Sequence, residues 1–567
     1  MTLLSWNAVG WGRALQLAAI GLTMTAGTVS GRAPQPAAAD LSAGEPVFTH
    51  VVTREETLIA LSRRLLADPR QWPQLQRHNR IVDPRRIPVG TVLKIPLRLL
   101  ATEPASARVL SAAGAVTGPQ GAAGAAGQAL PQGARLLAGD DGQATLQLVD
   151  GTVLRLRAGS AVQIETSRRL PRSGDALSGV KVEDGQVEVQ AQKRPGAGAP
   201  GFQISTPQGL LGVRGTEFRV SVDTQAQATR NEVLEGQVMT EGRDGRAGRS
   251  VAAGFGVVVD RSGAVTLPVR LLAAPDVSAW PVLHDQLLVR FAVAAQSAAV
   301  AFRGQVAAAS DPQFDRVLAD VRTEGAELRF AGLPDGHYRV RVRAEGPQGL
   351  QGLDARHAFT LKARPEPPLP ILPGAKAVLS GQRLQLAWAT VEEARSYRLQ
   401  LARSEDFSAP LQDRRGLTEP TLTLDGLDPG AYFWRVASER SATDQGPFGA
   451  AHRVELRPLP APPPPPRIDE DGVRLAWEGQ PGQSFDIEFA RDPAFAVLAL
   501  ARRVEQPVLS VKMPGTGRYY LRLRARDADG FVGPYTAPQA FTVPNCLRDG
   551  QQRCVGGADG GLVLIAP

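Results

Sequence analysis

Apolar and polar residues alternate one by one along most of this chain. In the stretch 144–157, four leucines fall on one face, and Arg155 and Arg157 fall on the other. A period of two residues is typical of a half-buried β-strand. The same period returns in segment after segment as far as residue 543. The pattern therefore predicts a mainly β protein, and 567 residues are enough for about four or five domains.

One alternating stretch carries regularly spaced glycines. Residues 209–222 read GLLGVRGTEFRVSV, with Gly209, Gly212 and Gly215 three positions apart. A phosphate-binding loop would need a helix after the glycines, because the helix N-terminus supplies the donors that hold the anion. Polar and apolar residues alternate after Gly215 instead. We therefore expect a strand whose glycines bend the backbone or let it approach a neighbour.

The same strand pattern predicts how the side chains near these glycines are oriented. Phe218 and Val220 are expected to point into a core, because they share one face of the strand. Arg214 and Glu217 either pair with each other across the bend or meet a partner.

Pairs of an acid and a glycine recur in this region. They are Asp150-Gly151, Asp184-Gly185 and Glu235-Gly236, each between two alternating runs. Glycine tolerates the positive φ that tight hairpin turns require. The sequence therefore predicts a turn between two strands at each pair.

A different pattern occupies residues 48–97. Three leucines between 58 and 65 recur at helical spacing, and Asp68-Pro69 is a typical N-cap and first position of a second short helix. Val51 and Val52 indicate a strand before the helices, and residues 91–95 indicate one after them. The expected order is β-α-α-β.

This unit, residues 46–98, resembles the LysM domain, a module that binds N-acetylglucosamine-containing chains such as peptidoglycan and chitin. The matching residues are Val52, Glu56-Thr57-Leu58, Trp72, Leu75, Asn79, Ile81 and the closing run IPVGTVLKIP at 87–96. Glu55 departs from the family, which commonly has glycine at this position, and adds bulk and charge to the first loop.

The resemblance implies a shallow sugar groove between two loops. Such a groove needs N–H and C=O groups for the acetamido group and an apolar floor for its methyl. Leu58 and Ile81 suit a core position as well as a sugar contact. The implied peptidoglycan-binding residues are Glu55, Glu56, Thr57 and Leu58 on one side, and Asn79, Ile81 and Val82 on the other.

Two segments follow this unit. Residues 99–133 are rich in Ala, Gly, Pro and Gln and poor in large apolar residues, so a flexible linker is expected.

Residues 134–266 resemble the FecR-type extracytoplasmic β-domain, and the run RGTEF at 214–218 is its most specific match. The resemblance implies an all-β domain of a family whose members restrain sigma factors across the inner membrane.

The last third of the chain repeats itself. GHYRVRV, GAYFWRV and GRYYLRL place tyrosines at 338, 432 and 519, and DPQF, SEDF and DPAF precede them. The tyrosines are 94 and then 87 residues apart. A repeat of this length with short alternating strands is typical of β-sandwiches. The copies resemble fibronectin type III-like modules, expected at 270–362, 375–457 and 467–544, with Trp388 and Trp477 in their cores. Pro-rich joints at 363–374 and 457–467 should be extended.

Both ends of the chain indicate export. Residues 1–39 read as a signal peptide, because Arg13 precedes a short apolar run and AAA at 37–39 offers a cleavage site. An uncleaved N-terminal anchor is the alternative. A Gly-rich tail, 545–567, carries Cys546 and Cys554, and an oxidising compartment favours a disulfide between them. We expect a periplasmic or cell-envelope protein with no transmembrane domain after signal cleavage.

The remaining composition supports few kinds of chemistry. The formal net charge is +8, but the arginines are scattered among acids, so nucleic-acid binding is not expected. Six histidines are spread over separate modules, and the two cysteines lack the further ligands of a metal site. No catalytic motif is present, so we expect no enzyme, no metal and no cofactor.

These observations predict an exported cell-envelope binding and scaffold protein. It would attach to peptidoglycan through the LysM module and present the FecR-type and fibronectin type III-like domains, and a partner protein in the envelope stays open. One alternative is a periplasmic signalling regulator related to FecR-type sigma-factor regulators, although few residues precede the apolar run. The other is a wall-remodelling accessory protein, although no catalytic constellation supports it.

Overall fold

The computed structural model describes residues 47–192, 202–243, 248–469 and 472–545, together with 547, 549–551, 555, 563 and 565. The expected signal peptide and both cysteines lie outside these residues. The chain divides into two compact units, residues 1–100 and residues 101–567. Among the described residues no helix has the length and apolar character to cross a membrane.

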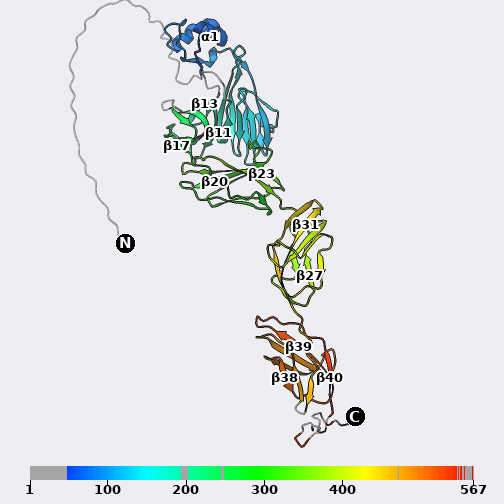
Figure 1. The fold of residues 1–567 in the computed structure, drawn as a ribbon. Helices are drawn as coiled ribbons and strands as arrows, with labels where there is room; N and C mark the ends of the chain where they lie inside the picture. Colours follow the sequence, from blue (N-terminus) through cyan, green and yellow to red (C-terminus); the bar gives the residue numbers. More distant parts are fainter. Residues whose placement is uncertain are drawn as a thin grey trace, which may run out of the picture. The chain divides into compact units, whose positions relative to one another are not determined.

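The first unit, which contains α1 and is blue in Figure 1, has the β-α-α-β order that the sequence predicts. Its elements are β1 (Val47–Val51), α1 (Leu58–Leu65), the 3₁₀ turn η1 (Pro69–Gln71), α2 (Trp72–His78), β2 (Val92–Pro96) and the 3₁₀ turn η2 (Leu97–Leu99). The two strands pair antiparallel. Asp68 caps η1 rather than an α-helix, accepting from the N–H of Arg70 at 3.0 Å, and α2 continues directly from that turn.

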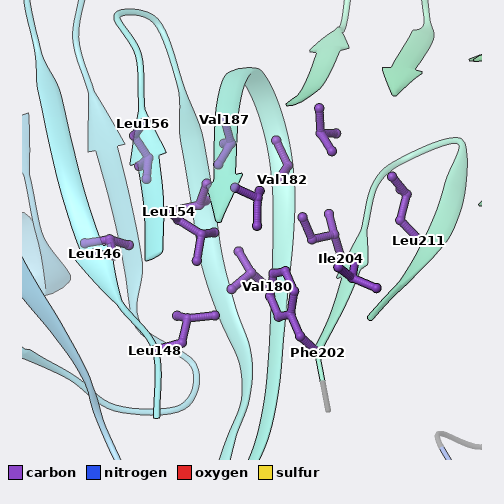
Figure 2. Packing of buried hydrophobic residues seen from close by; sticks show 14 of the residues in the cluster. Leu146, Leu148, Leu154, Leu156, Val180, Val182, Val187, Phe202, Ile204 and Leu211 are labelled. Atoms are coloured by element: carbon purple, nitrogen blue, oxygen red, sulfur yellow. The ribbon is translucent and has the colours of Figure 1, made fainter. Parts of the chain in front are cut away.

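The second unit begins with one sheet of fifteen strands, which we call the β-domain. Its strands are β3 (Glu103–Pro104), β4 (Ala107–Ala113), β5 (Val116–Thr117), β6 (Ala129–Leu130), β7 (Arg135–Ala138), β8 (Gln143–Gln147), β9 (Val153–Leu156), β10 (Ala161–Arg169), β11 (Ala176–Gln190), β12 (Phe202–Ser205), β13 (Gly209–Asp223), β14 (Ala228–Gly242), β15 (Arg249–Ala252), β16 (Phe255–Val259) and β17 (Val269–Arg270). Alternate residues of neighbouring strands meet in one core, as Figure 2 shows for Leu146, Leu154, Val180, Val187 and Phe202.

The prediction of a flexible linker at 99–133 is wrong for most of this segment. Strands β3 to β6 and the 3₁₀ turn η3 (Pro119–Gly121) occupy it, and β4 pairs with β8 along most of its length. Ala107, Val109 and Leu130 are buried in the core of the β-domain. Small residues suffice here because the large side chains that surround them come from strands later in the chain.

Two of the three acid–glycine pairs do not form hairpin turns. Gly151 lies in the turn between β8 and β9, as expected, with φ of 87°. Gly185 and Gly236 also have positive φ, 79° each, but they lie inside the continuous strands β11 and β14. The sequence predicts the backbone conformation correctly, but β13 pairs with β14 on both sides of Gly236. At Gly185, β11 continues while its partners change from β10 and β12 to β13 and β9.

Three sandwiches of two sheets each follow the β-domain. The first contains β18 (Leu283–His284), β20 (Ala301–Ala308), β21 (Ala319–Thr323), β23 (Gly336–Glu345) and β24 (Ala355–Leu361), with β19 (Val289–Ala292) and β22 (Glu327–Phe330) in the second sheet. The second contains β26 (Val378–Ser380), β28 (Ser396–Ala402), β29 (Gln412–Leu417), β31 (Gly430–Ser441), β32 (Asp444–Phe448) and β33 (His452–Arg457), with β25 (Pro370–Leu372), β27 (Leu384–Trp388) and β30 (Thr421–Leu424). The third contains β36 (Ser484–Ala490), β37 (Leu498–Val504), β39 (Gly517–Arg526) and β40 (Gln539–Val543), with β34 (Arg467–Asp469), β35 (Gly472–Ala476) and β38 (Val508–Val511).

The repeated sequence has a repeated structure. Each repeat tyrosine donates its hydroxyl proton to the carbonyl four residues earlier, at 2.6 Å from Tyr338, 2.7 Å from Tyr432 and 2.9 Å from Tyr519. The phenylalanine of each DPQF-like segment has a positive φ, and an arginine three residues after the tyrosine stacks on its ring. Trp388 is buried in its sandwich as expected, whereas Trp477 is only half-buried.

Candidate glycan-binding site

Two loops of the first unit meet as the sequence predicts. The loop at 53–57 joins β1 to α1, and the loop at 80–86 follows α2. The backbone N–H of Leu58 donates to the carbonyl of Pro84 at 3.0 Å and holds the two loops side by side. Every implied sugar-contacting residue lies on or beside these loops.

Glu55 and Glu56 have different roles despite their adjacency. Glu55 is exposed and has a φ of 72°, a conformation that favours glycine. Glu56 accepts from the N–H of Thr53 at 2.8 Å, from His50 at 2.8 Å and from Arg64 at 2.7 Å. Burial alone would raise the pKa of Glu56, but these hydrogen bonds and the neighbouring charges lower it to about 2. Glu56 therefore fixes the shape of the loop.

Thr57 and Leu58 begin helix α1. The Thr57 hydroxyl accepts from the N–H of Ala60 at 3.2 Å, which makes Thr57 the N-cap. Leu58 is fully buried among the core residues of the unit. Of the two roles that the sequence leaves open for Leu58, the structure supports the core position.

Asn79 ties the end of α2 to strand β2. Its amide group donates to the carbonyls of Leu75 at 3.0 Å and Lys94 at 2.8 Å, and its oxygen accepts from the N–H of Lys94 at 2.6 Å. The side chain is thus occupied by backbone groups on two elements. Asn79 therefore has a structural role, since it joins the end of α2 to β2.

The loop at 80–86 combines a fixed backbone with an exposed apolar side chain. The N–H of Ile81 donates to the carbonyl of Gln76 at 3.0 Å, and the Gln76 amide donates back to the carbonyl of Ile81 at 2.9 Å. Ile81 is half-buried, whereas Val82 is 96% exposed. An apolar residue so exposed beside polar backbone suits a sugar ring with an acetamido methyl.

The glycine-rich stretch at 209–222 is strand β13 and forms no phosphate loop. Gly215 has a φ of 57°, and Gly215 and Thr216 together oppose Gly236 of β14, which makes a β-bulge. Phe218 and Val220 are fully buried, as expected. The side chain of Arg214 lies outside the described part of the structure, so both alternatives, its pairing with Glu217 and a contact with a partner, stay predictions.

Sequence reasoning missed a buried charge cluster between the β-domain and the first sandwich. Glu188 of β11 accepts from Arg157 at 2.5 Å and, from the sandwich, from Arg341 at 2.6 Å. Arg219 of β13 donates to Asp354 at 3.2 Å and to the carbonyl of Gly352 at 2.6 Å. The available signal was the series of charged residues on what should be the solvent face of these strands, among them Arg155, Arg157, Glu188, Arg219 and Glu232.

The neighbouring charges compensate the burial of Glu188 fully and that of Glu232 only in part. Burial by itself would raise the pKa of Glu188, but Arg157, Arg341 and Arg343 hold it well below its usual range. Burial raises the pKa of Glu232, which Arg219 only partly offsets. An unpaired charge in this position would be costly, so the contact needs both domains to be folded.

Comparisons with known proteins match two parts of the chain. The family model of the LysM domain matches residues 50–96, and that of the FecR protein matches residues 134–239. No curated protein matches the chain.

Solved structures give weaker similarities. Two crystal structures of a candidate anti-sigma factor from Parabacteroides distasonis are 19% identical over 24% of this chain, with a TM-score of 0.20, and the chain spans 59% of the length of that protein. The FN1-FN3 domains of chicken CNTN1 are 13% identical and match 48% of this chain and 98% of their own, also with a TM-score of 0.20.

Proposed function

We propose that this protein, with its LysM and FecR domains, is an exported cell-envelope protein that attaches to peptidoglycan and presents its β-domain and three sandwiches. The observation that carries the proposal is the pair of loops at 53–57 and 80–86, which lie side by side within the LysM match. Val82 supplies an exposed apolar surface, and Glu56 and Asn79 hold the loops in place. The protein acts by binding and needs no catalytic group or cofactor.

Sedimentation with purified peptidoglycan tests this proposal. The full chain and a chain of residues 47–100 are expected to sediment with the polymer, whereas residues 101–567 stay in the supernatant. The division follows the boundary between the two compact units. A single LysM domain should bind weakly unless several copies act together, so the assay needs high polymer concentration. Equal sedimentation of residues 101–567 would contradict the proposal.

A second candidate function is a periplasmic signalling regulator, and the FecR match at 134–239 favours it. In this role the β-domain would bind a membrane-spanning or outer-membrane partner while the LysM domain holds the protein at the wall. Crosslinking in intact envelopes followed by capture of the full chain separates the two functions. Recovery of a sigma-factor pathway protein or an outer-membrane receptor supports the regulator, and recovery of wall glycan alone supports the scaffold.

A further inference from the structure

The LysM domain has a strong excess of positive charge. Residues 47–100 carry ten arginine and lysine side chains against four acidic ones, a net charge of +6, while the whole chain carries only +8. The basic character of the protein is therefore concentrated in the part that carries the groove. An excess of this kind attracts an anionic partner and raises the rate of encounter.

Most of the acidic groups in this domain are already engaged. Glu56 binds His50 and Arg64, as described above. Asp68 accepts from the N–H of Arg70 at 3.0 Å, and Asp83 accepts from the N–H of Arg85 at 2.8 Å. The two aspartates thus stabilise turns of the backbone, and their negative charges are already counted in the net charge of +6.

Three arginines lie on the loop that forms one side of the groove. Arg80, Arg85 and Arg86 are exposed, and their guanidinium groups contact no carboxylate within the described residues of this domain. Arginines of the second unit differ, because many pair with an acid, as Arg398 does with Asp413 at 2.6 Å. Arg70, elsewhere in the domain, is also exposed and contacts no carboxylate within the described residues. What distinguishes Arg80, Arg85 and Arg86 is that all three lie on the loop at 80–86.

The backbone that carries these arginines is held in one conformation. The N–H of Arg80 donates to the carbonyl of Arg77 at 3.2 Å, and the N–H of Arg86 donates to that of Asp83 at 3.2 Å. The Leu58–Pro84 hydrogen bond fixes the middle of the loop against the opposite side of the groove. A fixed loop lowers the entropy that a ligand must overcome to bind.

We infer that this LysM domain recognises two parts of its ligand at once: the acetamido sugar in the groove, and the carboxylates of the peptide stems through Arg80, Arg85 and Arg86. The inference rests on the proposed function. The planar guanidinium fork matches a carboxylate with two parallel hydrogen bonds. Chitin has the same sugar but no carboxylates, so these arginines favour peptidoglycan over chitin.

Binding of the full chain to three polymers tests the inference. They are intact peptidoglycan, the same glycan after an amidase has removed the peptide stems and the muramoyl carboxylates exposed in this way have been converted to neutral amides, and chitin. Arg85→Gln with Arg86→Gln is compared with Arg63→Gln plus Arg70→Gln, an equal loss of charge at exposed positions outside the two loops. Thermal unfolding checks that both double variants are folded.

The wild-type protein should bind intact peptidoglycan roughly tenfold more tightly than stem-free glycan or chitin, and more weakly at about 0.5 M salt. The Arg85/Arg86 variant should lose this preference and bind all three polymers alike, while the control variant keeps it. Equal wild-type affinity for intact and stem-free glycan overturns the inference but leaves the proposed function standing. No binding to any of the three overturns both.

Discussion

At the scale of single residues, Glu55 of the LysM domain has a backbone conformation that favours glycine. Glu55 holds a φ of 72°, where a side chain costs about 1–2 kcal/mol that glycine does not incur. The family preference for glycine at this position therefore has a backbone reason. The charge of Glu55 adds a second effect, because it lies beside a groove that we expect to receive carboxylates.

Two substitutions separate the strain of Glu55 from its charge. Glu55→Gly should stabilise the domain by about 1 kcal/mol and strengthen peptidoglycan binding, because it removes both. Glu55→Gln keeps the strained backbone, so it should leave stability unchanged and strengthen binding only through the lost charge. Thermal unfolding and sedimentation measure the two effects. Unchanged binding in both variants would show that this loop lies outside the groove.

At the scale of elements, the bulge in β13 explains the glycine-rich stretch. Gly215 and Thr216 face the single residue Gly236 of β14, and both glycines have positive φ. A Cβ on Gly236 would lie 2.6 Å from Cγ2 of Thr216, too close for any side chain. Beyond the bulge β13 changes its neighbour, from β12 before it to β11 after it. The glycines therefore allow one strand to serve two pairings.

Gly215→Val tests this role. A β-branched residue at a φ of 57° should destabilise the β-domain by about 1–3 kcal/mol. Glu217→Gln, a change at a half-buried neighbour with ordinary backbone, should cost no more than about 0.5 kcal/mol. Calorimetry of the full chain resolves both. If Gly215→Val unfolds like the wild type, the bulge has another role than backbone geometry.

At the scale of the whole molecule, the β-domain and the first sandwich share a buried interface. Gln143 exchanges two hydrogen bonds with the backbone of Val317, at 2.6 and 2.7 Å, and Arg157 reaches the carbonyl of Phe314 at 2.9 Å. Glu188 and Arg341 complete the contact from the two sides. Since these charges are stable only when paired, we expect the two domains to unfold together.

Glu188→Gln tests this coupling. The substitution leaves Arg157, Arg341 and Arg343 without their shared carboxylate, and removing one partner of such a buried cluster costs about 3–5 kcal/mol. Calorimetry should show one transition, shared by the β-domain and the first sandwich, that moves to lower temperature.

Asp413→Asn serves as the control, because it breaks the Arg398 pair inside the second sandwich and should shift only that module. If Glu188→Gln lowers the unfolding temperature of the β-domain and leaves the first sandwich unmoved, the two domains are independent.

The sequence alone determined the modular order of the protein. Period-two alternation predicted the strands, the helical spacing of three leucines predicted α1, and the repeated tyrosines predicted three sandwiches. Each of these signals is local, since backbone conformation and the choice of buried face depend on residues that are close in the chain. The positive φ at Gly151, Gly185 and Gly236 was predictable for the same reason.

Only the tertiary structure decided which segments meet. It placed the alanine-rich residues after 102 in the sheet of the β-domain and gave Asn79 a structural role. It also made β11 and β14 one continuous strand each, where the sequence predicted a turn in both. It also brought Glu188 to Arg341, 153 residues further along the chain. Such contacts depend on pairing across long sequence distances, where burial and hydrogen bonds come from partners that no local pattern specifies.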